Sequence, residues 1–162
     1  MDYTKEIKDI LHGEDDIQPI FDHFGLFTED RERIKEFLMT VPGAKILADR
    51  VVDFPQEIVT VGPPQKLSLY HIEVAGQDIE VIQPIECPDS YVAEVIKKHG
   101  GCFHHLALTF RTSAEHRKMC RILESKGYRC VLECTPRDLL VNYYEADNDE
   151  AIAFELKSTL ER

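Results

Sequence analysis

The sequence is short of positive charge. Its 162 residues contain 19 Lys and Arg against 30 Asp and Glu, which gives a formal net charge of −11 at pH 7. A surface with this charge repels the phosphates of nucleic acids and of anionic bilayers. We therefore expect neither a nucleic-acid partner nor a membrane partner.

A long apolar run is missing from the N-terminal region. The stretch MDYTKEIKDILHGEDDI is charged throughout and contains no continuous apolar segment. It predicts neither a signal peptide nor a membrane-spanning helix, because both need an uninterrupted apolar stretch. A cytoplasmic location is therefore expected.

Paired cysteines are missing as well. The five cysteines are odd in number and scattered, and no C-x-x-C pair occurs among them. This distribution argues against a disulfide framework and against a zinc ribbon, since both depend on regular cysteine spacing. We expect free thiols that pack in the interior.

What the sequence does contain is a pattern that occurs twice. In the first half, an alternating strand at 20–28 precedes an amphipathic helix at 29–40, and three apolar strands follow. In the second half, a strand at 103–110 precedes a helix at 113–127, and three strands again follow. Each half therefore reads β-α-β-β-β, and we predict the α+β class.

The repeat sets the predicted domain organisation. A short helix after Pro88 ends in glycine and links the two halves. The length of the chain suits one compact domain with a sizeable core. We predict an N-terminal extension at 1–19, a first module at 20–86, a linker helix at 87–101 and a second module at 102–158.

Aligning the two halves pairs residues that could bind a metal. FDHFGLFT falls on FHHLALTF, which pairs His23 with His105, and DIEVI falls on AFELK, which pairs Glu80 with Glu155. Each half thus offers one imidazole from its first strand and one carboxylate from its last. Two imidazoles and two carboxylates form a suitable ligand set for a divalent transition metal.

Strand alternation distinguishes the adjacent histidines 104 and 105. Successive side chains of a strand point to opposite faces, so only one of the two rings should face the metal. The next residue on the face of each predicted ligand is small, Gly25 after His23 and Ala107 after His105, and we expect this to leave room for a bound ligand. His104 shares its face with leucines and is predicted to pack beneath a helix. His116 lies among charged residues and is expected to be solvated.

The doubled pattern, the His-Glu-His-Glu order and the stretch DSYVAEVIKKHGGCFHHLAL together resemble a known superfamily. The chain resembles the vicinal oxygen chelate (glyoxalase/bleomycin resistance/dioxygenase) superfamily and, within it, the methylmalonyl-CoA epimerases, over roughly residues 21–158. The resemblance implies two modules that curl into open half-barrels, a curled mixed sheet around one central metal site. It also implies His23, Glu80, His105 and Glu155 as ligands, and homodimers are common in the family. Cobalt, nickel, zinc, manganese and iron all suit these donors.

The resemblance also implies a class of reaction. A metal that accepts a carbonyl oxygen stabilises the charge that forms when a proton leaves the adjacent carbon. The implied activity is therefore that of a metal-dependent isomerase or lyase, foremost the epimerisation of a 2-methylacyl-CoA such as methylmalonyl-CoA. Two alternatives stay open: a lactoylglutathione lyase-like enzyme that acts on a glutathione adduct, and a metal-free small-molecule binding protein of the resistance type.

Such a reaction needs a base beside the metal. If Gly76-Gln77 forms a two-residue turn, Glu73 faces Glu80 across the hairpin and His71 lies on the same face. His71 and Glu73 are therefore candidate bases. Family members also use a metal-bound glutamate as the base, which makes Glu155 a third catalytic candidate.

Overall fold

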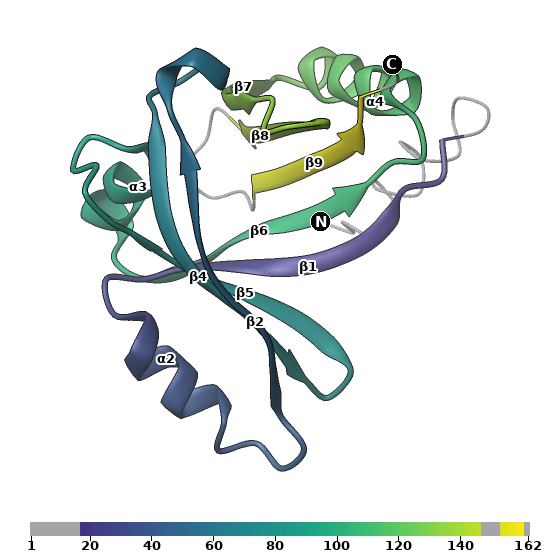
Figure 1. Ribbon diagram of the computed structural model, residues 1–162. Helices are drawn as coiled ribbons and strands as arrows, with labels where there is room; N and C mark the ends of the chain where they lie inside the picture. Colours follow the sequence, from purple (N-terminus) through teal and green to yellow (C-terminus); the bar gives the residue numbers. More distant parts are fainter. Residues whose placement is uncertain (1–16, 147–152, 161–162) are drawn as a thin grey trace.

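A computed structural model of the chain describes residues 17–146 and 153–160, so the predicted N-terminal extension lies outside the described residues except for 17–19. Figure 1 shows how the elements are arranged. In chain order they are β1 (Ile20–Phe27), α2 (Arg31–Leu38), β2 (Lys45–Phe54), the 3-10 turn η1 (Gln56–Ile58), β3 (Val59–Val61), β4 (Gln65–Val74), β5 (Gln77–Pro84), α3 (Tyr91–His99), β6 (Cys102–Thr109), α4 (Ser113–Ser125), β7 (Tyr128–Cys134), β8 (Leu139–Ala146) and β9 (Ala153–Thr159).

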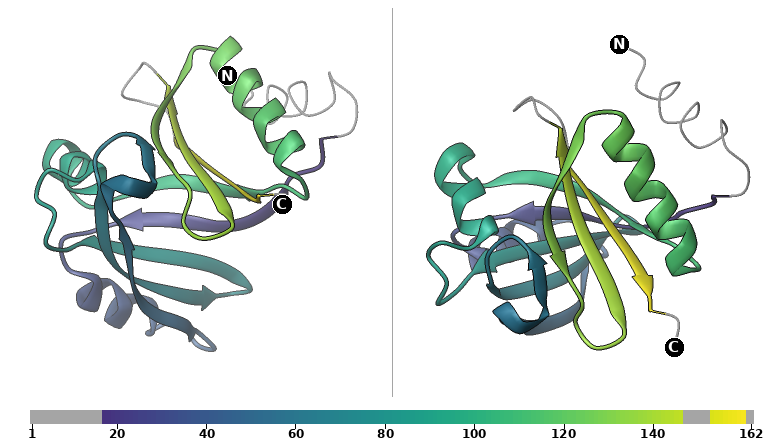
Figure 2. Two further views of the ribbon diagram at one scale, coloured as in Figure 1. Left: turned by 45° about the horizontal axis from the view of Figure 1, so that its top comes forward. Right: turned by 90° about the horizontal axis from the view of Figure 1, so that it is seen from above.

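The described strands form one sheet, whose curl is visible in the two views of Figure 2. The strand order is β2-β4-β5-β1-β6-β9-β8-β7-β3. The two halves of the chain meet where β1 pairs with β6 in antiparallel fashion. β1 pairs in parallel with β5, and β6 pairs in parallel with β9, so the sheet is mixed. The predicted α+β fold, two β-α-β-β-β modules that build a curled mixed sheet, is confirmed.

Strand β3 is an addition to the predicted pattern. It follows β2 in the chain, yet it pairs with β7 at the opposite edge of the sheet, with Val59 beside Cys134. Residues 55–58 therefore connect the two edges of the sheet directly.

Helices α2 and α4 cover the outer face of the sheet, one on each module. Leu38 of α2 packs with Tyr70 and Ile72 of β4, and Leu123 of α4 packs with Leu156 of β9. Because strand side chains alternate, the neighbours of Tyr70, Ile72 and Leu156 point to the inner face. Burying one such apolar side chain contributes about 1.5–3 kcal/mol to stability.

Helix α3 packs at one end of the inner face. Its residues Val92 and Ile96 lie against Phe27 of β1 and Ile82 of β5. The inner face is therefore apolar at the α3 end, and the polar residues described below occupy the remainder. None of the described helices is long and apolar enough to span a bilayer.

The hairpin between β4 and β5 turns one residue earlier than predicted. Ala75 and Gly76 form the turn, and both have positive φ angles, 51° and 80°. His71 consequently faces Glu80, and Glu73 faces Asp78. The predicted pairing of Glu73 with Glu80 is wrong because the two turn residues are Ala75 and Gly76, and not Gly76 and Gln77.

The five cysteines are free thiols. Cys134 is buried, and the other four are partly buried. Burial raises the pKa of the Cys134 thiol to about 12, so this side chain stays protonated at neutral pH and packs as a small apolar group.

Candidate metal centre

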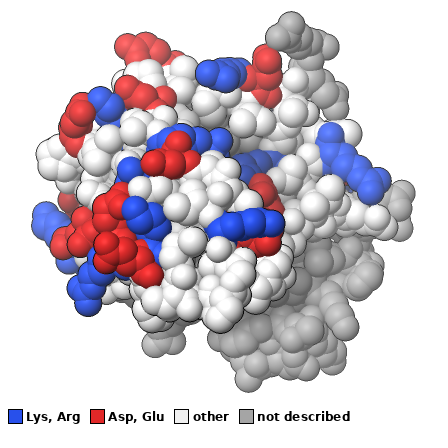
Figure 3. Space-filling model, turned by 60° about the horizontal axis from the view of Figure 1, so that its bottom comes forward, with Lys and Arg blue, Asp and Glu red and all other residues white. Residues whose placement is uncertain are grey.

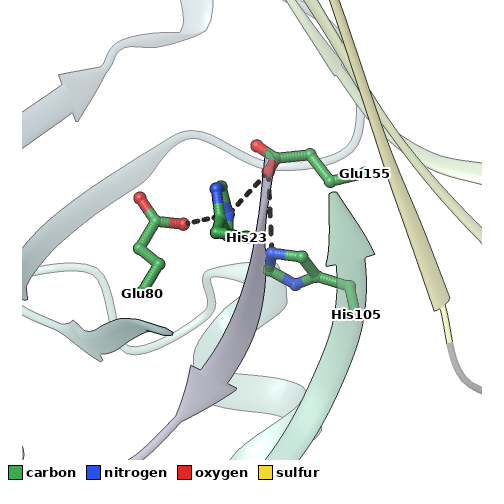
Figure 4. Close-up of side chains that lie close together, drawn as sticks. All are labelled: His23, Glu80, His105 and Glu155. Carbon is green, nitrogen blue, oxygen red and sulfur yellow. Dashed lines mark ion pairs between the residues drawn. The ribbon is translucent and has the colours of Figure 1, made fainter. Parts of the chain in front are cut away.

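Four side chains from four neighbouring strands converge on the inner face. His23 comes from β1, Glu80 from β5, His105 from β6 and Glu155 from β9, and these strands are consecutive in the sheet. One potential ligand atom from each residue lies within 4.8 Å of the others. Figure 4 shows the two imidazoles and two carboxylates pointing toward one another. The structure therefore brings together the four residues that the repeat singled out.

The contacts within this cluster are close. His23 Nε2 lies 3.0 Å from Glu80 Oε2 and 3.1 Å from Glu155 Oε2. His105 Nε2 lies 3.6 Å from the same Glu155 oxygen. No more than 9% of any of the four side chains is exposed. The cluster is therefore a buried set of donor atoms, with two carboxylates available to balance a divalent cation.

The donor atoms themselves are left unsatisfied. His23 Nε2, His105 Nε2 and Glu155 Oε2 are buried, and none of them makes a hydrogen bond of acceptable geometry among the described residues. Burying a polar atom without a partner costs about 1–3 kcal/mol. A divalent metal bound by these atoms removes that cost, because each lone pair then has a partner. The residues present therefore fit a divalent transition metal.

The two imidazoles have opposite electrostatic environments. Burial lowers the pKa of His23, but the carboxylates of Asp22, Glu155 and Glu80 outweigh it and raise the pKa to about 11. Burial lowers the pKa of His105 to about 3, and the Glu155 carboxylate opposes this only in part. In the protein without metal, His23 is therefore cationic and His105 is neutral.

The carboxylates remain ionised in spite of burial. Burial raises the pKa of Glu80, whereas the rings of His23 and His71 lower it and prevail. Burial also raises the pKa of Glu155. The Lys157 ammonium and His23 outweigh burial and lower this pKa below its usual range. Both carboxylates therefore offer the anionic form that binds a metal.

Irregular strand pairing lies beside His23. Phe21 pairs with Leu108 and Phe24 with Leu106, so β1 carries an extra residue beside His23. A β-bulge of this kind redirects side chains and is common next to functional sites. The bulge therefore helps to aim His23 at the cluster.

Gly25 is required by the ring of His105. The two residues are paired across β1 and β6, and a Cβ atom on Gly25 would lie 1.9 Å from His105 Cε1. The expectation that Gly25 leaves room for a bound ligand is wrong, because the imidazole itself fills that space. Gly25 therefore serves to admit the ring.

The structure places His104 differently from the prediction. A second bulge leaves His104 unpaired between Phe103 and His105, so strict alternation fails at this point. Its ring stacks on Phe27 with a centroid distance of 4.1 Å, and His104 Nδ1 lies 3.0 Å from His105 Nδ1. The two rings are therefore in contact and do not point to opposite faces.

His71 lies directly beside the cluster. Its Nε2 is 3.2 Å from Glu80 Oε1, and its Nδ1 is 2.8 Å from Asp78 Oδ2. Arg50 Nη2 lies 3.0 Å from His71 Nε2. Since a guanidinium can only donate, a neutral His71 accepts at Nε2 and donates from Nδ1 to Asp78. Burial lowers the pKa of His71, and Glu80 and Asp78 overcome this and raise it.

Glu73 does not reach the cluster. It lies near the turn of the β4-β5 hairpin, where its Oε1 is 3.1 Å from Lys45 Nζ. A third of its side chain is exposed. The shifted hairpin register explains the difference from the prediction, since His71 occupies the position that was assigned to Glu73.

Sequence reasoning missed several charged neighbours of the cluster. Asp22 Oδ1 lies 3.6 Å from His23 Nδ1, and Asp22 also pairs with Lys157, whose Nζ is 3.9 Å from Glu155 Oε2. Lys157 and Asp78 each lie two residues from a predicted ligand glutamate, so strand alternation puts them on the same face. That spacing was the signal that could have found them.

His116 is buried, although it was expected to be solvated. It is 0% exposed on the buried side of α4, and its Nδ1 lies 2.8 Å from Ser158 Oγ of β9. Burial lowers its pKa to about 4. The charged residues around it in the sequence lie on the other sides of the helix, so the local sequence did not reveal its orientation.

Other surface features lie apart from the cluster. A cavity of about 520 Å³ opens between the start of α2 and the Gly100-Gly101 turn, and none of the four cluster residues lines it. On the face shown in Figure 3, Lys and Arg side chains are interspersed with Asp and Glu, with uncharged areas between them. The acidic excess therefore forms no single continuous patch on that face.

Comparisons with known proteins place this geometry in context. Residues 22–139 match the model of the Glyoxalase/Bleomycin resistance protein/Dioxygenase superfamily. A search of curated proteins gives no significant match. Among solved structures, a hypothetical protein from Bacillus halodurans is 18% identical, with a TM-score of 0.61, and the match covers 90% of this chain and 97% of that one.

Two further similar structures are methylmalonyl-CoA epimerases. The enzyme from Mycobacterium tuberculosis is 18% identical, with a TM-score of 0.59 and coverage of 87% of this chain and 88% of that one. A variant of the Streptomyces coelicolor enzyme, in complex with 2-nitronate-propionyl-CoA, is 18% identical, with a TM-score of 0.57 and coverage of 90% and 100%. These identities show a shared fold. With a family match over residues 22–139, the chain belongs to the glyoxalase/bleomycin resistance protein/dioxygenase superfamily.

Proposed function

We propose that this protein is a metal-dependent isomerase that removes a proton next to a carbonyl group and epimerises a 2-methylacyl-CoA such as methylmalonyl-CoA. The observation that carries the proposal is the buried cluster of two imidazoles and two carboxylates with unsatisfied donor atoms, with His71 beside it. Similar folds include methylmalonyl-CoA epimerases, one of them bound to an acyl-CoA analogue.

His23, Glu80, His105 and Glu155 are the residues that would hold the metal. When bound, a divalent transition metal supplies a Lewis acid that stabilises the negative charge formed as the proton leaves. Cobalt, nickel, zinc, manganese and iron all suit two nitrogen and two carboxylate donors. The cluster lies on the inner face of the sheet, where the low dielectric strengthens such stabilisation.

We assign the role of base to His71. Its Nδ1 is 2.8 Å from Asp78 Oδ2, which orients the ring, and its Nε2 faces Glu80 in the cluster. A neutral imidazole in this tautomer carries its lone pair on Nε2, which can accept the proton from the carbon once the substrate displaces Arg50 from that nitrogen. Arg50, 3.0 Å from that nitrogen, offers a cation to a carboxylate of the entering substrate.

An epimerase must also exchange a proton on the opposite face of the same carbon. Glu155 comes from the other module, so it approaches the cluster from a different strand than His71. We propose that Glu155 exchanges this second proton, in addition to its role as a ligand. A lactoylglutathione lyase-like isomerisation would need one base alone and no second exchanging group.

Deuterium exchange tests the proposal. Metal-loaded protein incubated with methylmalonyl-CoA in deuterated water should place deuterium on the carbon next to the thioester carbonyl. His71→Gln should slow this exchange by about 10²- to 10⁴-fold, the usual contribution of a general base. Glu73→Gln, on the same strand but outside the cluster, should exchange like the unaltered protein.

Other outcomes would decide against the epimerase. Absence of exchange in short branched acyl thioesters, together with turnover of a glutathione hemithioacetal, would identify a lyase-like enzyme. Failure to take up any of the five metals would identify a metal-free small-molecule binding protein. The expected homodimer is a separate prediction, which light scattering tests.

A further inference from the structure

A buried polar network joins the candidate metal centre to a glutamate on β8. It runs from His105 through His104 and Tyr91 to Glu145. His105 Nδ1 lies 3.0 Å from His104 Nδ1, and His104 Nε2 lies 2.8 Å from Tyr91 Oη. The Tyr91 hydroxyl donates to Glu145 Oε1. His104 is 8% exposed and the Glu145 side chain is 30% exposed, so the network extends from the interior toward the surface.

Several parts of the fold hold this network in place. The bulge in β6 turns His104 toward His105, and Phe27 stacks on the His104 ring at 4.1 Å. Tyr91 is the first residue of α3, and its ring stacks on Tyr143 with a centroid distance of 5.9 Å. Phe27 and the bulge therefore hold His104, the direct partner of His105. Tyr143 holds Tyr91, the partner of His104.

The direction of each hydrogen bond follows from the chemistry of the groups. A metal on His105 Nε2 requires the lone pair there, so the proton of that ring sits on Nδ1 and is donated to His104 Nδ1. The proton of His104 must then sit on Nε2, where it is donated to Tyr91 Oη. Tyr91 in turn donates to the Glu145 carboxylate, which only accepts. Each hydrogen bond of the network therefore has one assigned donor and one assigned acceptor.

We propose that His104, Tyr91 and Glu145 are positioning residues that hold His105 in the tautomer with a free Nε2 and thereby set the affinity of the site for a divalent metal. The inference rests on the proposed metal site. Partners that bind the second nitrogen of a ligand histidine typically account for about 10- to 100-fold in metal affinity. The proposal also gives a reason for the two adjacent histidines: His105 binds the metal, and His104 orients the ring of His105.

Tautomers measured by nuclear magnetic resonance test the proposal directly. Long-range proton–nitrogen spectra of the zinc-loaded protein should show His104 protonated on Nε2 alone and His105 protonated on Nδ1. A His104 that carries its proton on Nδ1, or on both nitrogens, would overturn the inference. Failure of zinc to bind at all would instead contradict the proposed metal site, so the two failures are distinguishable.

Zinc affinities of matched variants provide a second test. Tyr91→Phe and Glu145→Gln should each weaken zinc binding about tenfold or more, measured by competition with a chromophoric chelator. Tyr144→Phe is the control, because Tyr144 is also buried and donates to a glutamate, Glu124, but lies on the outer face. Circular dichroism establishes that each variant is folded.

The combination of variants separates positioning from general destabilisation. In a double variant, Glu145→Gln should add little to the cost of Tyr91→Phe, since Tyr91→Phe already removes the hydroxyl that joins His104 to residue 145. Unchanged zinc affinity in both folded single variants would overturn the proposal. Equal weakening in Tyr144→Phe would also overturn it, because the effect would then not depend on the network.

Discussion

The two modules give the candidate centre the same pair of side chains but surround them differently. His23 and Glu80 of the first module lie among Asp22, His71 and Asp78. In the second module, the ring of His105 lies against Tyr143 at 4.9 Å. The pKa of His23 rises to about 11, whereas burial lowers that of His105 to about 3. Without a metal, equivalent positions of this repeat therefore have opposite charge states.

The strand opposite each glutamate shows where the modules diverge. His71 faces Glu80 in the first module, and Tyr143 faces Glu155 in the second. Asp78, which orients His71, corresponds to Ala153, since each lies two residues before its glutamate. The duplicated framework supplies four donors, and the divergent neighbours give an imidazole, His71, beside the cluster to the first module alone.

The residue before each histidine is polar in both modules, but its chemistry differs. Asp22 precedes His23 and His104 precedes His105, and a bulge lies beside each pair. Asp22 connects His23 to Lys157, whereas His104 connects His105 to Tyr91. A different neighbouring side chain therefore orients the proposed ligand ring in each module, Asp22 in the first and His104 in the second.

Removing either histidine ligand should have the largest effect on metal binding. His23→Ala and His105→Ala should each weaken zinc affinity by more than about a hundredfold, because loss of a ligand exceeds the cost of losing an outer partner. Competition with a chelator measures this. His99→Ala, at an exposed histidine of α3, is the control. A large loss in only one ligand variant would contradict a site shared between the modules.

Substitutions at Gly25 and Ala107, the small residues two positions after the two histidines, should differ in their effect on stability. Gly25→Ala puts a Cβ atom onto the His105 ring and should cost about 1–3 kcal/mol of stability, together with zinc affinity. Ala107→Gly adds no atom and should cost about 0.5–1 kcal/mol through chain entropy. Thermal unfolding and zinc titration measure both variants. Wild-type behaviour of Gly25→Ala would show that the His105 ring does not occupy this space.

The smallest expected effect is on the pH dependence of folding stability, to which the outer face of the second module should contribute through His116. Burial lowers the pKa of His116 to about 4, so the folded state resists its protonation more than the unfolded state does. Stability from this group is complete above about pH 6.5 and is lost as the pH falls toward 4. Between pH 7.5 and 5.5 the loss is on the order of 1 kcal/mol.

Denaturant unfolding of a variant isolates this contribution. Between pH 7.5 and 5.5, the free energy of unfolding of His116→Gln should fall by about 1 kcal/mol less than that of the unaltered protein. Helix α2 of the first module buries only Leu38, so no corresponding histidine exists there. Equal pH dependence in the variant and the unaltered protein would contradict a buried neutral His116.

Much of the fold could be predicted because both copies of the repeat show the same periodic spacing of apolar residues. Alternating and helical periods identified both modules, and pairing the halves placed one histidine and one glutamate at equivalent positions in each. The structure brings those four residues within 4.8 Å of one another, because their strands are consecutive in the sheet. Local pattern and duplication were sufficient for this part.

The surroundings of the centre depended on features that periodicity does not encode. The turn at Ala75-Gly76 uses a positive φ at alanine, which no residue preference signals, and it shifts the partner of Glu80 from Glu73 to His71. The bulge at His104 breaks the alternation on which its orientation was based. Strand β3 pairs across the curled sheet, a contact that requires the whole fold.

Anomalous diffraction from crystals grown with zinc or cobalt would show whether a metal binds at the four-residue cluster. The account predicts one peak per chain, in contact with His23 Nε2, His105 Nε2 and carboxylate oxygens of Glu80 and Glu155. No peak at this position would contradict the account. A peak centred instead on His71 and Asp78, which form a second candidate group with His23, would also contradict it, because the proposed base would then be a ligand.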